Sequence, residues 1–212
     1  MHNNYLSTFV PTTKTRTMKK TLSIIAAALL STASFAQNTV WNSDQGHSSV
    51  AFAVDHMVIS ETTGQFGEYA VVAKADKDDF SDAQFEVTIQ MNSIDTRDEK
   101  RDGHLKNGDF FDVEKFPTMT FKSTKMKKGK GKNYKLHGDL TLKGVTKAVV
   151  FDAKFGGIIT DPWGNTRAGI KITGEIDRQD YGVTYNSVMD SGGLAVGNEV
   201  RIETSLELIK QK

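Results

Sequence analysis

The sequence contains no cysteine among its 212 residues. This absence excludes disulfide bonds, thiolate metal ligands, a cysteine nucleophile and a lipid anchor attached through cysteine. The chain also lacks the run of about 20 apolar residues that a helix needs to cross a bilayer. We therefore expect a fold that is held together by its buried core and that has no stable membrane anchor.

Positive charge is not in excess either. Four of the 27 Lys and Arg residues, and none of the 26 Asp and Glu residues, lie within residues 1–36. The rest of the chain is therefore mildly acidic, with charges of mixed sign. Because proteins that bind nucleic acids carry a basic surface, this balance argues against nucleic acid as the partner.

Motifs for catalysis and cofactor binding are missing as well. The chain has no Gly-x-Ser-x-Gly elbow, phosphate-binding loop or dinucleotide fingerprint. His47 and His56 are nine residues apart, which places them on opposite faces of a regular strand and makes them poor co-ligands. Since a metal site needs three or four converging ligands, we expect neither a metal nor another cofactor.

The N-terminal region contains a predicted secretory signal. Residues 18–36 read MKKTLSIIAAALLSTASFA: two lysines, a short apolar stretch, and small residues before Ala36. That order is typical of a signal peptide that is cleaved near Ala36. Residues 1–17 are an N-terminal extension, either an early start codon ahead of Met18 or a longer basic region. We therefore expect residues 37–212 to form one domain, located in the periplasm or secreted.

Apolar and polar residues alternate from Val40 to the C-terminus. In residues 84–91 one face is polar, and the other carries Phe85, Val87, Ile89 and Met91. Strict alternation predicts half-buried antiparallel strands, and turn signals separate about eight of them. Such strands form either a closed barrel or a two-sheet sandwich, and their length favours the all-β barrel.

One charged segment interrupts the alternation. Residues 98–112 read DEKRDGHLKNGDFFD, which predicts one or two helical turns interrupted by Gly103 and Gly108. A short helix at the mouth of a barrel and a simple solvated connection are both consistent with this composition.

Short motifs occur in a fixed order across most of the chain. They are His47-Ser48-Ser49-Val50, Gly64-Gln65-Phe66, Ser93-Ile94-Asp95-Thr96, Arg101-Asp102-Gly103-His104-Leu105, Asp109-Phe110-Phe111, Phe116-Pro117-Thr118, Gly138-Asp139-Leu140-Thr141-Leu142, Asp161-Pro162-Trp163-Gly164 and Arg178-Gln179-Asp180-Tyr181-Gly182. In this combination the chain resembles the YceI-like family of lipocalin-like, polyisoprenoid-binding exported proteins.

The resemblance implies an eight-stranded antiparallel barrel with a short helix near its mouth and an elongated apolar cavity that holds an isoprenoid chain. Alternation alone does not distinguish such a cavity from a filled core, because both need an apolar inner face. Small residues at inward positions either leave room for a ligand or relieve crowding in the wall. These residues are Gly138, Ala153, Ala168 and Gly174.

We expect inward apolar side chains to line the cavity and to contact the ligand. The candidates are Phe52, Val54, Phe66, Phe85, Val87, Ile89, Leu105, Phe121, Leu140, Phe151 and Ile172.

The polar candidates lie in the charged segment and are Arg101, Asp102 and His104. An arginine can grip a phosphate or other polar head group, and a histidine can donate a hydrogen bond or titrate near neutral pH. The alternative is that Arg101 and Asp102 pair with neighbours and fix the helix on the barrel.

Three functions stay open at this level. The leading one is an exported binding protein, not an enzyme, that carries or stores a polyisoprenoid or similar long apolar lipid. The second is an enzyme that acts on a bound lipid-like substrate through the polar groups at the mouth. The third is a structural or adhesive β-module with a solid core. The oligomeric state is not readable from the sequence, and a homodimer stays open.

Overall fold

The computed structural model describes Met1, residues 39–189 and residues 192–212. Gln37–Lys212 forms one compact unit, and every described strand belongs to it. The predicted signal peptide and its cleavage site lie outside the described residues and stay predictions. In the part of the chain that is described, no helix has the length and apolar character needed to span a bilayer.

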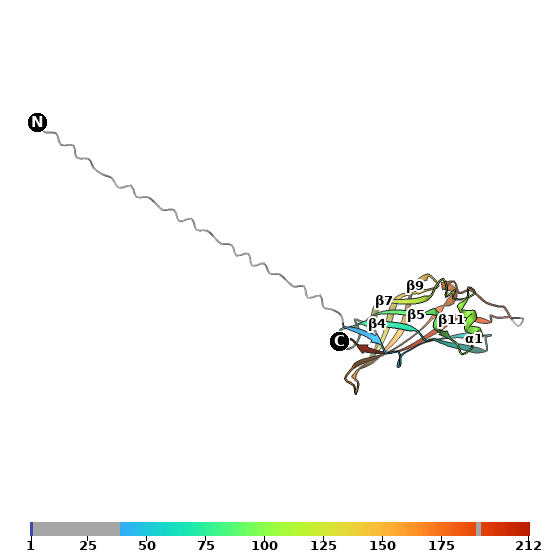
Figure 1. Ribbon diagram of the computed structural model, residues 1–212, viewed down its shortest axis with the longest axis horizontal. Helices are drawn as coiled ribbons and strands as arrows, with labels where there is room; N and C mark the ends of the chain where they lie inside the picture. The colour runs from blue at the N-terminus through green and yellow to red at the C-terminus, as the bar shows by residue number, and fades with distance from the viewer. Residues whose placement is uncertain (2–38, 190–191) are drawn as a thin grey trace. The chain divides into compact units, whose positions relative to one another are not determined.

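Antiparallel strands account for most of this unit (Figure 1). They are β1 (Val40–Ser43), β2 (Ser49–His56), β3 (Ser60–Phe66), β4 (Tyr69–Lys74), β5 (Gln84–Gln90), β6 (Ile94–Asp95), β7 (Thr118–Lys128), β8 (Asn133–Leu142), β9 (Val145–Thr160), β10 (Thr166–Asp177) and β11 (Val196–Lys210). The helical elements are the α-helix α1 (Glu99–Lys106) and two 3₁₀ turns, Met91–Ser93 and Arg178–Tyr181.

These strand segments occupy eight positions around a closed barrel. β1 and β2 both pair with β11, one with each end of it, so they are the two halves of one interrupted strand. β4 and β3 pair with these two halves, and β6 continues β5 beside β3. Pairing of β1 with β11 closes the ring. The predicted eight-stranded antiparallel barrel is confirmed, and the interruptions in its first three strands are an addition from the structure.

The inner face of the barrel carries the apolar half of each alternating pattern. On β8, every second residue from Tyr134 to Leu142 is buried, and the residues between them are exposed or half-buried. Successive side chains of a strand point to opposite faces, so this period of two places one face inside the barrel.

One end of the barrel is solidly packed. The Phe80 ring stacks on Phe155 with 5.0 Å between centroids, and it meets Trp41 edge-on at 5.1 Å. Leu208 and Ala168 face each other across β11 and β10 and are almost fully buried. Fully burying a large apolar side chain contributes about 1.5–3 kcal/mol, so this end supplies a dense core.

A charged cluster centred on Arg167 lies where β1 and β2 separate, beside β11. Arg167 Nη1 lies 2.6 Å from Asp44 Oδ2 and 2.5 Å from Glu207 Oε1, and Arg167 Nε lies 2.6 Å from Asp161 Oδ2. The Arg167 side chain is only 13% exposed. Its hydrogen bond, with a second one from His47, lowers the pKa of Asp44 to about 2. The cluster therefore joins three separate parts of the chain through one shared cation.

Replacing Arg167 by methionine should destabilise the barrel most near neutral pH. The loss should be larger there than that of an exposed surface ion pair, because three carboxylates lose their common cation. The folded pKa of Asp44 is lower than its unfolded pKa, so its contribution is present above about pH 4 and is lost as the pH falls toward 2. Urea unfolding near neutral pH and again at about pH 3 should show the difference between wild type and Arg167→Met shrinking in acid.

Lys171→Met is the matched control for this experiment. Lys171 also projects from β10, but its ion pair with Glu203 is about half exposed on both sides. Removing such an exposed pair should change the free energy of unfolding by less than about 1 kcal/mol. An Arg167→Met loss that is the same at both pH values would contradict the assignment of the cluster.

Candidate functional site: an apolar lumen

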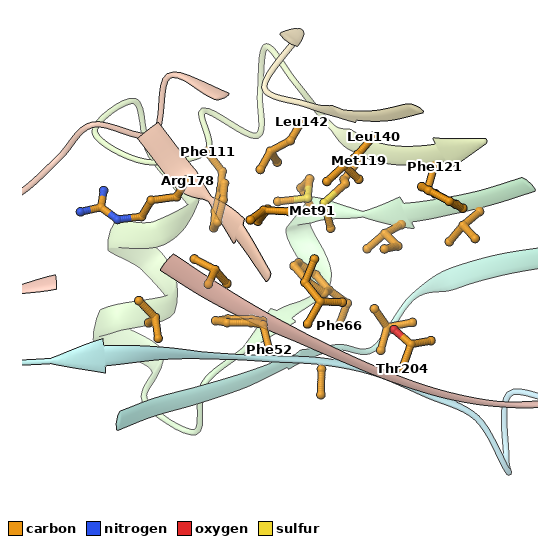
Figure 2. A pocket seen from close by; sticks show the side chains of 18 of the residues that line it. Phe52, Phe66, Met91, Phe111, Met119, Phe121, Leu140, Leu142, Arg178 and Thr204 are labelled. Carbon is orange, nitrogen blue, oxygen red and sulfur yellow. The ribbon is translucent and has the colours of Figure 1, made fainter. Parts of the chain in front are cut away.

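An apolar cavity occupies the barrel on the α1 side of the packed end. Its volume is about 150 Å³, and apolar side chains from β2, β3, β5 and β7 to β11 form most of its wall (Figure 2). Leu105, Phe110 and Phe111 close it from the α1 side. Because an apolar cavity of this kind stays dry, it favours an apolar guest over water.

Ten of the predicted ligand-contacting residues line this cavity. They are Phe52, Val54, Phe66, Val87, Ile89, Leu105, Phe121, Leu140, Phe151 and Ile172. That each one contacts a ligand stays a prediction. The wall also includes residues that were not candidates, namely Val50, Met91, Phe110, Phe111, Met119, Leu142, Ile176, Val183, Val196, Val200, Ile202 and Leu206. Most of these lie on the same strand faces as the candidates, so the alternation of apolar and polar residues also indicates that they point inward.

Phe85 is the exception among the apolar candidates. It is 1% exposed and pairs with the fully buried Ala73, but it is not part of the cavity wall. Phe85 therefore belongs to the packed core. Alternation identifies the inner face of a strand but carries no information on depth along the barrel axis, which is why Phe85 and Val87 look equivalent in the sequence.

Arg101 and Asp102 hold Thr96 and do not line the cavity. Arg101 donates from Nε to the Thr96 hydroxyl and from Nη2 to the Thr96 carbonyl, each at 2.7 Å. Asp102 Oδ1 accepts hydrogen bonds from the Thr96 backbone N–H at 2.9 Å and the Thr96 hydroxyl at 2.6 Å. Thr96 is 4% exposed. The two side chains thus fasten α1 to the residue that follows β6. This arrangement agrees with the alternative in which Arg101 and Asp102 pair with neighbours and fix the helix on the barrel.

His104 joins α1 to the loop that precedes β11. Its Nε2 lies 3.0 Å from Asp109 Oδ2. The imidazole meets the rings of Phe110 and Tyr185 edge-on, at centroid distances of 5.0 and 4.9 Å. Phe110 lines the cavity, whereas His104 lies behind it. None of the three polar candidates in α1 therefore lines the lumen.

Arg178 is the charged residue of the cavity wall among the described residues. It is 4% exposed, and burial lowers the pKa of its guanidinium. Figure 2 shows the guanidinium pointing away from the apolar side chains. It donates hydrogen bonds to four backbone carbonyl oxygens, those of Val183, Tyr185, Val196 and Gly197.

The role of Arg178 is therefore to fasten both ends of the loop that leads into β11. In the sequence, Arg178 stands out only as part of the motif Arg178-Gln179-Asp180-Tyr181-Gly182. A signal was nevertheless present, because Arg178 continues the inward series Ile172, Gly174 and Ile176 of β10.

Two of the small inward residues lie beneath aromatic rings. A Cβ atom on Gly138 would stand 2.4 Å from the Phe121 ring, and a Cβ atom on Gly174 would stand 2.4 Å from the Phe151 ring. The rings therefore lie against the barrel wall, where the glycines leave room for them. Ala153 and Ala168 are buried but do not line the cavity. The glycines thus widen the lumen indirectly, by letting neighbouring rings lie close to the wall.

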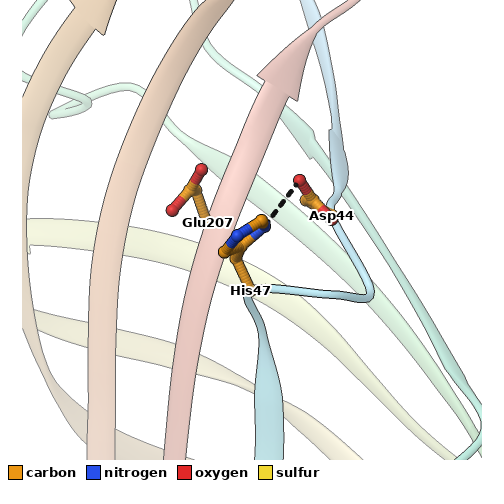
Figure 3. Close-up of side chains that lie close together, drawn as sticks. All are labelled: Asp44, His47 and Glu207. Atoms are coloured by element: carbon orange, nitrogen blue, oxygen red, sulfur yellow. Dashed lines mark hydrogen bonds and ion pairs between the residues drawn. The ribbon is translucent and has the colours of Figure 1, made fainter. Parts of the chain in front are cut away.

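Asp44, His47 and Glu207 place three possible metal-ligand atoms within 4.8 Å of one another (Figure 3). The Arg167 guanidinium already bonds both carboxylates, at 2.6 and 2.5 Å. A metal ion would have to displace this cation. The geometry is therefore that of the structural ion cluster described above.

A closed antiparallel barrel with an apolar lumen and a short helix beside its mouth defines a lipocalin-like β-barrel. Comparison with known proteins gives the family: the YceI-like domain matches residues 41–208, and the chain belongs to the YceI-like family.

Relatives and solved structures agree with this assignment. A UPF0312 protein of Staphylococcus aureus strain N315 is 37% identical over 165 residues, which cover 77% of this chain and 94% of the relative. The YCEI protein of Campylobacter jejuni is 31% identical, with a TM-score of 0.64 over 74% of this chain and 90% of that one. A polyisoprenoid binding domain from Saccharophagus degradans, implicated in plant cell wall breakdown, is 13% identical, with a TM-score of 0.62 over 82% of this chain and all of that one, and shows the fold alone.

Replacing Gly174 by alanine should move the Phe151 ring into the lumen. The added methyl group would stand 2.4 Å from Phe151 Cδ1, so the ring must turn away from the wall. Overpacking of this kind costs about 1–3 kcal/mol, and the displaced ring should also reduce the uptake of a fluorescent apolar probe. Urea unfolding and probe titration measure the two effects.

Gly103→Ala is the control, because a Cβ atom at this position in α1 meets nothing within 4 Å. It should leave probe binding unchanged and stabilise the chain by up to about 1 kcal/mol through helix propensity. Unchanged probe binding in Gly174→Ala would show that the ring does not control the lumen.

Proposed function

We propose that the chain is an exported binding protein that holds one long apolar molecule, of the isoprenoid type, in the barrel lumen for transport or storage. The observation that carries the proposal is the cavity, whose wall is apolar on nearly every side. A polyisoprenoid binding domain has the same fold, and its ligand class is the one that we carry over as a hypothesis. Export rests on the predicted signal peptide of residues 18–36.

The energetics favour recognition through the apolar tail. Burying one CH₂ group contributes about 0.8 kcal/mol, so one five-carbon isoprene unit contributes about 3 kcal/mol before ordering costs. An exposed ion pair with a head group contributes only about 0–1 kcal/mol. Because Arg101, Asp102 and Arg178 are all engaged with the protein itself, the tail should set the affinity.

The lumen must widen to accept a long chain. Its volume of about 150 Å³ is smaller than the roughly 300–1,000 Å³ of typical ligand sites. Met91 and Met119 line it, and unbranched methionine side chains adapt readily to a guest. We therefore expect binding to be accompanied by rearrangement of side chains in the wall.

No observation favours an enzyme acting on a bound lipid. That alternative requires Arg101, Asp102 and His104 to converge on the lumen, and none of them lines it. The structural β-module with a solid core is also disfavoured, because the part of the barrel next to α1 contains a cavity of about 150 Å³.

The proposal is tested by extracting lipids from the purified chain and analysing them by mass spectrometry. Wild type should yield a long apolar molecule in repeated preparations. Val54→Phe and Val87→Phe each place a larger side chain in the lumen and should reduce the recovered amount at least about tenfold, since each lost 1.4 kcal/mol is a factor of ten.

Val150→Phe adds the same volume on the outer face of β9, where Val150 is 52% exposed, and should retain the ligand. Circular dichroism confirms that each variant is folded. Repeated recovery of no apolar molecule from folded wild type would refute the proposed function.

A further inference from the structure

Two loops beside the lumen expose a concentration of apolar side chains. One is the hairpin tip between β2 and β3, residues 57–59, and the other precedes β11 and is described for residues 183–189 and 192–195. Within residues 39–189 and 192–212, ten large apolar side chains are exposed, and six of them lie on these two loops. We call these six the mouth patch: Met57, Val58, Ile59, Tyr185, Val188 and Leu194.

The two loops touch each other, so the mouth patch is continuous. The Met57 backbone N–H donates to the Ala195 carbonyl oxygen at 2.9 Å. A Cβ atom built on Gly193 would stand 3.4 Å from Val58 Cγ2. Apolar side chains in a connected patch of several hundred Å² mark an interaction surface more often than scattered ones do.

The mouth patch also continues into the cavity wall. Val54 and Val196 line the lumen and lie on β2 and β11 directly beside the two loops. Val183 at the start of the second loop lines it as well. Tyr185 of the patch packs against Phe110, another wall residue, with ring centroids 4.8 Å apart. An apolar path therefore leads from the exposed tips to the interior.

The hairpin tip is built from residues that its backbone disfavours. Met57 and Val58 have φ angles of 53° and 67°. Glycine and asparagine suit this left-handed region, and a β-branched residue such as Val58 is strained there. Strain of this kind persists mainly at functional positions. The tip therefore retains large apolar side chains at the expense of turn stability.

The charges around the tip identify the kind of surface that it fits. Residues 57–60 carry no charge. Asp55 and His56 precede them, and Glu61, which follows, is ion-paired with Arg201 of β11, so the surroundings of the tip carry no excess of positive charge. Basic residues that would attract anionic lipid are absent from the tip. Exposed aliphatic side chains at loop ends, without an anchoring charge, suit the interface of a neutral lipid layer.

We propose that the mouth patch inserts into a neutral lipid surface and so places the opening of the lumen against the bilayer. This inference rests on the proposed function, because an apolar ligand resides in membranes. Every CH₂ group that crosses water is penalised, and a mouth seated in the lipid interface removes that step. The patch is thus the surface through which the barrel is loaded or emptied.

Fluorescence of single-cysteine variants tests the inference, and the chain contains no other cysteine. An environment-sensitive dye on Ile59→Cys should shift to the blue when phosphatidylcholine vesicles are added to residues 37–212, the compact unit that remains after the predicted cleavage near Ala36. The same dye on Ile159→Cys is the matched control, because Ile159 is also an exposed isoleucine but pairs with Arg167, far along β10 from the mouth. Its emission should not change.

A second variant separates docking from folding. The double variant Met57→Asn, Val58→Gly places at the tip two residues that adopt positive φ angles readily. Its unfolding temperature should therefore equal or exceed that of wild type. Co-sedimentation of this variant with phosphatidylcholine vesicles should fall at least about tenfold, because the variant lacks two apolar side chains that would enter the lipid. Ile159→Ser should sediment with vesicles like wild type.

Three results would overturn the docking inference. They are an unshifted dye on Ile59→Cys with vesicles present, binding that occurs only with anionic phosphatidylglycerol, and a dye shift without vesicles that tracks dimer formation in sedimentation velocity. Any of these, with lipid still recovered by extraction, leaves the proposed function standing. Absence of extractable lipid from wild type refutes the proposed function whatever the vesicles show.

Discussion

The packing of Trp41, Phe80 and Phe155 at one end of the barrel makes the hollow at the other end possible. Atoms that line a cavity lack the dispersion contacts of a filled core, and such losses reach several kcal/mol. The closed ladder, which leaves no free edge between β1 and β11, and the dense end core offset this loss. The Arg167 cluster adds a link at the point where β1 and β2 separate. One end thus stabilises the fold, and the other is free to hold a guest.

This division explains what could be predicted from the sequence. Period-2 alternation depends only on the local geometry of a strand, so it placed residues such as Val87, Phe121 and Ile172 on the inner face correctly. Depth along the barrel depends on the register between strands, which local alternation does not contain. Phe85 and Val87 therefore look equivalent in the sequence, although only Val87 lines the cavity. Three barrel strands are interrupted at residues 44–48, 67–68 and 91–93, and the alternation of apolar and polar residues does not show that the segments on the two sides belong to one barrel position. Arg101 and Asp102 form hydrogen bonds with Thr96, which is close to both in the chain. Only the fold shows that these bonds hold the Arg101 and Asp102 side chains outside the lumen.

The polar side chains near the mouth hold loops of the protein in place. Arg178 is bonded to four carbonyls of the loop that leads into β11, and His104 contacts Tyr185 of the same loop. Their fixed arrangement leaves the lumen to recognise its ligand by shape and apolar character. A site of this kind discriminates weakly among chains that differ by one CH₂ group, because each contributes only about 0.8 kcal/mol.

Because the lumen is narrow, binding of a ligand should affect the stability of the folded barrel. The side chains around the cavity of about 150 Å³ lack neighbouring atoms on one side, and a bound apolar chain would supply the missing contacts. A ligand that binds only the folded barrel stabilises it in proportion to the logarithm of its concentration relative to Kd. The loaded protein should therefore be the more stable form, and release requires a surface that accepts the ligand as readily as the lumen does. A lipid layer meets that condition, and bulk water does not.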